Sequence, residues 1–187
     1  PHLYPYNLHE GGPYNAKDRQ NLKDWHRERL KEVEMHETPL VCGEFGLSPS
    51  SLDFDVYLQD FHEIFDANLW HWAYWSNDNG GWSPITHDGE ETPILNELIR
   101  AYPKATAGRI RSFNYNKEDK VFTMDFVSRS NSTQPTEIFV PKRFFANGFD
   151  VQVETSAEYS HDYNDKNQVL SLTVKGQADV KVTISAK

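Results

Sequence analysis

In the first hundred residues, helical patterns alternate with short apolar runs, and this order constrains the fold more than any other feature. Residues 16–36 carry an apolar stripe at helical spacing, and residues 40–45 follow as a short apolar run. Residues 50–67 and 69–75 repeat this pair, and residues 93–102 have the pattern of a third helix. Apolar runs between helices are typical of parallel strands buried on both faces. The order predicts the C-terminal part of a (β/α)8 TIM barrel.

The pattern changes near residue 104. Helical spacing stops, and seven short stretches alternate apolar and polar residues between turn-forming residues. These stretches are 109–115, 120–127, 136–140, 149–154, 158–163, 168–174 and 179–185. Their spacing is typical of an antiparallel, all-β sandwich. We therefore expect two domains, with residues 1–103 belonging to the barrel and residues 104–187 forming the β-sandwich.

The composition argues against several classes of function. The net charge is −9 and the basic residues form no cluster, which argues against nucleic acid and against docking on anionic membranes by charge. No apolar run approaches the roughly 20 residues that span a bilayer. The single cysteine, Cys42, excludes an intrachain disulfide framework. The eight histidines show no metal-ligand spacing, so we expect no metal and no other cofactor.

A carboxylate, Glu44, lies at the end of the first apolar run, in the segment Val-Cys-Gly-Glu-Phe-Gly at 41–46. Burying such a charge without purpose would be costly. At the carboxyl end of a barrel strand, it would face the site where barrel enzymes carry out their chemistry. Gly43 and Gly46 leave room beside it. A Glu that merely leaves the strand for solvent explains this segment, taken alone, equally well.

The second apolar run is rich in tryptophan, with Leu-Trp-His-Trp-Ala-Tyr-Trp at 69–75. Side chains alternate along a strand, so Trp70 and Trp72 share a face with Tyr74, while Trp75 ends the opposite face. We expect one set to pack against the helices, and the set that ends in Trp75 to suit the barrel interior and mouth. Indole rings stack on sugars but also fill cores, so both interpretations remain open.

Two further groups of residues are weaker pointers to a site. His2 and Tyr4 are two positions apart, so on a strand they share a face and could orient a carboxylate or a sugar. A His-x-Tyr also occurs often by chance. In the loop at 76–91, Asn77 and Trp82 either line the entrance for sugar or lipid or simply shape a turn.

Together and in this order, these features resemble strands six, seven and eight of the family five glycoside hydrolases. In that family a His-x-Tyr closes strand six, the nucleophilic Glu closes strand seven, and a Trp at the end of strand eight stacks on the sugar. The matching residues here are His2 and Tyr4, Glu44, and Trp75. Within the family, residues 2–14 and the Pro-Thr-Glu-Ile-Phe-Val-Pro segment at 135–141 look most like the endoglycoceramidases.

The resemblance implies a retaining mechanism, in which Glu44 attacks the anomeric carbon while a second carboxyl group protonates the leaving oxygen. It implies that Tyr4 donates a hydrogen bond to Glu44 or near the ring oxygen, and that His2 supports the acid/base or the sugar. The substrate-binding residues expected from the resemblance and the aromatic pattern are Trp75, Trp72, Asn77 and Trp82. Ceramide would also need apolar surface, for which the nearest candidates are Phe45, Leu47, Trp82 and Ile85.

The acid/base of the family is the Glu of an Asn-Glu pair on strand four, and this pair has no counterpart on a barrel strand here. The only such pair, Asn96-Glu97, lies in the third predicted helix. We therefore expect an N-terminal segment of the same enzyme to complete the barrel and to contribute the acid/base.

The resulting hypothesis is a retaining endo-β-glycosidase that cleaves the glycan–ceramide linkage of glycosphingolipids. Its substrate would be a glycosphingolipid or another β-glycoside. The alternatives are an endoglucanase or β-glucosidase of the same family, and a non-catalytic carbohydrate-binding or structural fragment. We expect a secreted, extracellular enzyme whose signal peptide would lie upstream of this chain.

Overall fold

The computed structural model describes residues 1–78 and 80–187, which form two compact units, Pro1–Leu98 and Ile99–Lys187. Among these residues, no helix has the length and apolar character required to cross a bilayer. Each unit has its own hydrophobic core.

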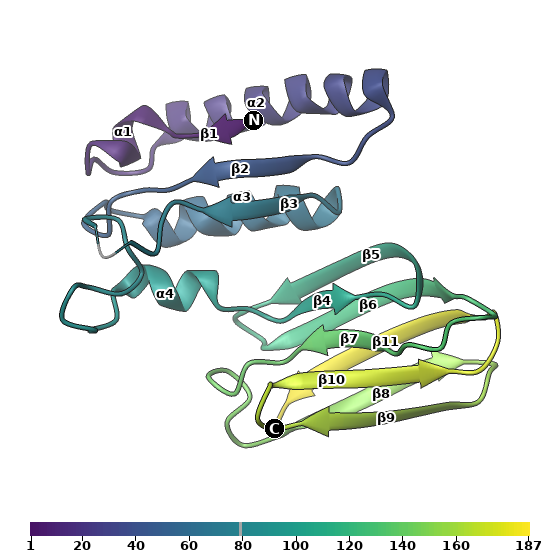
Figure 1. The fold of residues 1–187 in the computed structure, drawn as a ribbon. Coiled ribbons are helices and arrows are strands. Elements are labelled where there is room, and N and C mark those ends of the chain that lie inside the picture. Colours follow the sequence, from purple (N-terminus) through teal and green to yellow (C-terminus); the bar gives the residue numbers. More distant parts are fainter. Residues whose placement is uncertain (79) are drawn as a thin grey trace. The chain divides into compact units, whose positions relative to one another are not determined.

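The first unit contains a three-stranded parallel sheet in the order β1-β2-β3 (Figure 1). Its strands are β1 (His2–Leu3), β2 (Val41–Phe45) and β3 (His71–Tyr74). Its helices are α1 (Tyr6–His9), α2 (Ala16–His36), α3 (Phe54–Ala67) and α4 (Pro93–Leu98). Parallel strands joined through helices confirm the βα alternation expected from the sequence.

Helix α2 begins and ends on residues suited to those positions. The Asn15 side chain accepts hydrogen bonds from the first turn, and the Asp18 carboxylate accepts one from the Asn15 backbone amide, which completes a capping box. The helix ends at His36, and its C-cap residue Glu37 has a left-handed backbone (φ 50°), two residues before Pro39. The chain then enters β2.

Helix α3 begins at Phe54 rather than at residue 50. Asp53 has a left-handed backbone (φ 59°) and makes no side-chain cap bond. The nearby serine Ser51 instead donates to the backbone oxygen of Leu8, so it ties this loop to α1. Tertiary contacts therefore determine where this helix begins.

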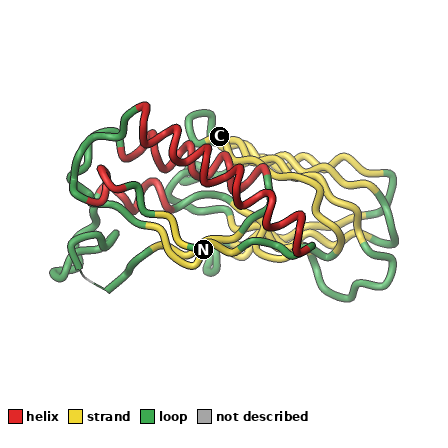
Figure 2. The backbone as a smooth tube through the Cα atoms, turned by 90° about the horizontal axis from the view of Figure 1, so that it is seen from above, coloured by secondary structure: helices red, strands yellow, loops and turns green. Residues whose placement is uncertain are grey.

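The core of the first unit is aromatic and lies between the sheet and its helices. Phe45 on β2 stacks on Phe61 of α3 with ring centroids 3.9 Å apart, and Phe61 stacks on Phe65 at 4.1 Å. Helices α2 and α3 lie together on one face of the sheet (Figures 1 and 2). Val41 on β2 remains 53% exposed although it belongs to a parallel sheet, a class that is normally covered on both faces.

The second unit consists of two four-stranded antiparallel sheets, in the orders β4-β7-β10-β9 and β5-β6-β11-β8 (Figure 1). The strands are β4 (Tyr102–Ala105), β5 (Gly108–Asn116), β6 (Val121–Ser128), β7 (Thr136–Phe139), β8 (Phe149–Thr155), β9 (Tyr159–Asn164), β10 (Val169–Val174) and β11 (Asp179–Ala186). Both sheets contribute to one buried core, with Phe122 and Val182 from one sheet and Ile138 and Leu172 from the other.

All seven strands expected after residue 104 are present, and β4 is an additional one. The third predicted helix, over residues 93–102, is too long. The helix α4 ends at Leu98, and Tyr102 already pairs with Phe139 in β4. Pro103 disfavours a helical backbone at the residue before it, which is consistent with an extended Tyr102. The division between the units accordingly falls after Leu98 rather than after Pro103.

Candidate active site

The side chains of His2 and Tyr4 meet at one oxygen of Glu44. The Tyr4 hydroxyl donates to Oε2 of Glu44 over 2.8 Å, and Nδ1 of His2 lies 3.1 Å from the same oxygen. Oε1 of Glu44 has no hydrogen-bond donor within the described ranges. The carboxylate is partly exposed, with 28% of the side-chain surface accessible, so a small molecule can reach it.

Parallel pairing between β1 and β2 brings these residues together. His2 pairs with Glu44 and Leu3 with Phe45, and the Gly43 amide donates to the backbone oxygen of Pro1. Tyr4, two residues beyond His2, reaches the same carboxylate from just after the end of β1. The meeting of the three side chains therefore depends on strand register.

Tyr4 is held in its protonated form. Burial raises the pKa of its hydroxyl well above the usual range, and the hydrogen bond to the Glu44 carboxylate raises it further. A neutral phenol is a donor, so the contact with Glu44 is maintained across ordinary pH values. Next to this pair, burial also raises the pKa of the Cys42 thiol to about 11, which leaves it an unreactive buried thiol.

Gly46 allows two chain segments to approach each other closely beside the carboxylate. A Cβ atom at this position would lie 2.3 Å from the backbone oxygen of Trp75 and 3.3 Å from Cε3 of Trp82. The Trp75 amide also donates to the Phe45 carbonyl over 2.7 Å. The absence of a side chain at Gly46 therefore lets the ends of β2 and β3 come together.

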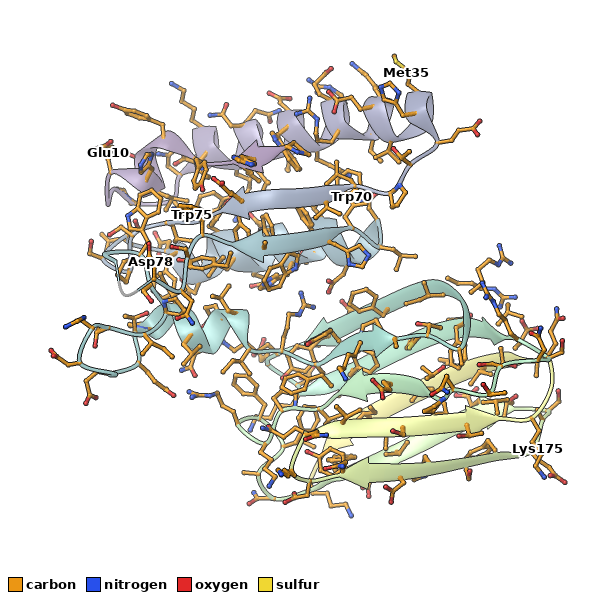
Figure 3. The ribbon with its side chains drawn as sticks, viewed as in Figure 1. Glu10, Met35, Trp70, Trp75, Asp78 and Lys175 are labelled. Carbon is orange, nitrogen blue, oxygen red and sulfur yellow. The ribbon has the colours of Figure 1, made fainter. Side chains whose placement is uncertain are left out.

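Trp75 is 48% exposed and follows β3 directly, and its peptide bond to Ser76 is cis. Figure 3 shows Trp75 at the end of the sheet to which the strands point, on the same side of the unit as Glu10 and Asp78, whereas Trp70 lies at the opposite end. The exposed indole thus lies at the same end of the sheet as Glu44.

Trp72 packs toward the core of the first unit, and its expected role in substrate binding stays a prediction. Its ring packs against Phe45, Phe61 and His62, with centroids between 5.4 and 6.4 Å away. Trp70, on the same face of β3, is buried with 6% exposure. Strand alternation therefore divides the tryptophans into a core set and the exposed Trp75.

Trp82 reaches the site from the loop after β3. Its ring centroid lies 6.0 Å from that of Tyr4. The Tyr74 hydroxyl donates to its backbone oxygen over 2.9 Å, which fixes this part of the loop to the strand. Sequence reasoning assigned no role to Tyr74 beyond its side of the strand.

The other loop candidates contribute less. Asn77 is exposed, and no contact joins it to Glu44, His2 or Tyr4 in the part of the chain that the structure describes. Phe45 and Leu47 are fully buried, so the expectation that they face lipid is wrong; Trp82 and Ile85 are only partly buried. Within the described ranges, no cluster of His, Cys, Asp or Glu side chains could hold a metal ion.

Sequence reasoning missed His9. Its ring packs edge-on against Trp82 with centroids 4.5 Å apart, and it lies 6.0 Å from Tyr4. Nothing in the local pattern indicates this position, because His9 belongs to the short helix α1, which carries no periodic signal. The contact becomes visible only once the loop after β3 is placed.

Known proteins resemble this chain in sequence and in fold. Residues 100–185 match the glycoside hydrolase family 5 C-terminal domain. Endoglycoceramidase I of Rhodococcus hoagii (strain 103S) is 30% identical over 126 residues, which is 65% of this chain and 23% of that protein. Endo-glycoceramidase II from Rhodococcus sp., in a structure described as a ganglioside GM3 complex, covers the whole chain with a TM-score of 0.84 and 25% identity.

A more distant likeness concerns the fold alone. Sterylglucosidase 1 of Cryptococcus neoformans matches 90% of this chain with a TM-score of 0.64 at 14% identity. This chain spans 23% of the length of the curated relative and 42% of the endo-glycoceramidase II chain. The similarity therefore concerns less than half of each of these relatives.

Proposed function

We propose that this chain, which corresponds to the C-terminal portion of an endoglycoceramidase-like glycoside hydrolase of family 5, supplies the nucleophile Glu44 of a retaining endo-β-glycosidase. The substrate is a glycosphingolipid, and the bond that breaks links the glycan to ceramide. The substrate class rests on the relatives, one of which is described as a complex with ganglioside GM3.

The observation that carries the proposal is the asymmetry around the Glu44 carboxylate. Oε2 contacts Tyr4 and His2, whereas Oε1 has no donor within the described residues. A carboxylate held through one oxygen keeps its orientation and leaves the other oxygen free to form a bond. A nucleophile must be fixed in this way, because a reacting atom is effective only in a near-attack geometry.

The reaction has two steps. In the first, Oε1 of Glu44 bonds to the anomeric carbon, the bond to the ceramide oxygen breaks, and a second carboxyl group gives that oxygen a proton. In the second, the same group removes a proton from water, the water oxygen attacks the anomeric carbon, and Glu44 leaves as a carboxylate. The two carboxyl groups of a retaining enzyme lie roughly 5–5.5 Å apart.

Tyr4 and His2 are positioning residues in this scheme. The Tyr4 hydroxyl donates to Glu44 and retains its proton because its pKa is raised. Nδ1 of His2 must carry a proton to donate to the same oxygen. Both donors stabilise the carboxylate that departs in the second step, when negative charge returns to Glu44.

We assign the acid/base to a preceding segment that completes the barrel. Val41 on β2 is 53% exposed, and exposed apolar surface on a parallel sheet calls for a covering layer. The long stretch of the endo-glycoceramidase II chain outside the match is consistent with such a segment. Glu97 lies in α4 rather than on a barrel strand, so we do not assign it this role.

We propose a supporting role for the β-sandwich of residues 99–187. A carbohydrate-binding module would need several aromatic rings exposed on one face. Instead, Tyr115 packs near Phe144 and Phe145, and Tyr163 packs against Phe149. Tyr102 and Tyr159 remain exposed, at 41% and 45%, but they lie on opposite edge strands of their sheet, β4 and β9.

The test replaces Glu44 with Gln in the complete enzyme. Gln keeps the shape of the side chain but cannot attack the anomeric carbon, so we expect an intact fold and no turnover of glycosphingolipid. A 2-deoxy-2-fluoro glycoside should label Glu44 covalently in the parent enzyme. Label on any other carboxylate, or turnover by the E44Q variant, would refute the assignment.

The same assay separates the substrate hypotheses. An endoglycoceramidase releases the intact oligosaccharide from a glycosphingolipid. A β-glucosidase releases single glucose units from simple glucosides, and an endoglucanase cleaves within a glucan chain. Turnover of glucosides or glucans, with the glycolipid left intact, would favour these alternatives from the same family.

A further inference from the structure

His9 and Trp82 form a packed aromatic pair beside the proposed nucleophile. Their rings meet edge to face at 4.5 Å with an interplanar angle of 83°, which is a favoured aromatic geometry. The rings of both residues also lie 6.0 Å from that of Tyr4, whose hydroxyl contacts Glu44. Tyr4 therefore links the His9–Trp82 pair to the Glu44 carboxylate.

Each member of the pair is attached to the fold independently. Leu8, next to His9, is fully buried, and its backbone oxygen accepts hydrogen bonds from the Ser51 hydroxyl and the Ser48 amide. Trp82 is held by the bond from the Tyr74 hydroxyl to its backbone oxygen. The ring contact thus joins the segment after β1 to the loop after β3, on either side of β2.

The two rings differ in what they can offer a ligand. The indole of Trp82 is partly exposed and presents a broad apolar surface next to the site. His9 is exposed, and its ring lies nearly perpendicular to that indole with the centroids 4.5 Å apart, so it restricts the tilt of the indole. The backbone at Gly46 also lies close to the indole, because a Cβ atom added at this position would be only 3.3 Å from Cε3 of Trp82.

We propose that Trp82 is the apolar wall of a substrate subsite beside Glu44 and that His9 is the positioning residue that sets its orientation. The ligand surface is apolar C–H, supplied by a sugar ring face or by the lipid. The inference rests on the proposed function, since it takes Glu44 to be the reacting group. It adds His9 to the residues that determine how well substrate binds.

The experiment uses the complete enzyme with His9→Ala and His9→Phe. Losing the edge contact should raise KM roughly three- to tenfold, because an aromatic pair of this kind has about that effect on binding. The turnover number kcat should change much less, since His9 touches neither Glu44 nor the reacting bond. Phe keeps a ring at the edge of Trp82, so H9F should restore most of the KM.

His87→Ala is the matched control, because His87 is an exposed histidine in the same loop as Trp82. It should leave KM unchanged. If H9A fails to fold, His9→Asn takes its place, since Asn removes the ring but retains a polar side chain at an exposed position. A fall in kcat with unchanged KM in H9A or H9N would overturn the proposal.

Two substrates with the same glycan identify the ligand surface. If Trp82 contacts the sugar, H9A raises KM for both a glycosphingolipid and an aryl glycoside. If it contacts lipid, KM rises for the glycosphingolipid alone. Unchanged KM for both substrates in H9A, with E44Q inactive, would refute the role of His9 while leaving the nucleophile assignment standing; an active E44Q would instead refute the nucleophile.

Discussion

The hydroxyl of Tyr4 donates to Oε2 of Glu44 over 2.8 Å, although the two residues are 40 positions apart in the chain. The contact forms because β1 and β2 are parallel neighbours whose register pairs His2 with Glu44. The His-x-Tyr motif that begins on β1 and the Glu44 carboxylate on β2 are thus brought together at the carboxyl ends of these strands.

Replacing Tyr4 with Phe should remove one donor to Glu44 and preserve the ring contact with Trp82. We expect kcat in the complete enzyme to fall by roughly 10–100-fold, because a lost charge-assisted hydrogen bond is worth about 1.5–3 kcal/mol. The melting temperature should change little. Steady-state kinetics beside a thermal melt checks this, and an unchanged kcat would show that Tyr4 does not act on Glu44.

Gly46→Ala should disturb the site through sterics alone. The new methyl group would lie 2.3 Å from the backbone oxygen of Trp75, so the strand end must shift. We expect a loss of roughly 1–3 kcal/mol in the free energy of unfolding, together with reduced kcat/KM. Gly81→Ala is the control, since a Cβ there meets no atom within 4 Å. Equal effects of the two variants would contradict the argument.

The two tryptophans on opposite faces of the β3 segment should respond differently to alanine. Trp72→Ala empties a position packed against Phe61 and His62, so we expect about 3–5 kcal/mol of destabilisation. Trp75→Ala, at a position that is 48% exposed, should retain most of the stability and lose activity. Chemical denaturation and kinetics on both variants would separate the roles, and the reverse pattern would assign Trp72 to the site.

Stability should fall at alkaline pH. Burial raises the pKa of Tyr4, Tyr14, Tyr57 and Tyr74 in the folded protein above the value of about 10 for an exposed tyrosine. Above that pH the unfolded chain loses protons that the folded chain keeps, so the free energy of unfolding decreases as pH rises. This contribution is fully present below about pH 10. Melting temperatures measured across the alkaline range check it, and a flat profile would contradict it.

The parts of the fold that depend on side-chain periodicity were predictable from the sequence. Strands of the second unit, such as β6 with its strict alternation of buried and partly buried residues, have nearly the expected bounds. Periodicity did not predict the ends of those helices whose boundaries are determined by tertiary contacts. Helix α3 begins at Phe54 rather than at residue 50, and Tyr102 pairs with Phe139 instead of extending α4.

The residues of the candidate site likewise differ in how far the sequence alone indicates them. Glu44 and Trp75 were identified because each ends an apolar run, and strand ends are marked in sequence. For Trp72, alternation puts the ring on the face of Trp70, but the sequence cannot distinguish a core position from a sugar site, because an indole has the same local pattern in both. The sequence around His9 gives no indication that it lies at the site, because its contact with Trp82 depends on the path of a loop.

The strand β1 is two residues long, yet its pairing with β2 brings both donors to Glu44. Short elements that make few apolar contacts open locally at a smaller free-energy cost than a packed core. The aromatic stack of Phe45, Phe61 and Phe65 joins β2 to the core of helix α3. Local opening at residues 2–4 would consequently take both donors away from the Glu44 carboxylate while the core persists, so we expect the complete enzyme to lose activity on heating before it unfolds globally.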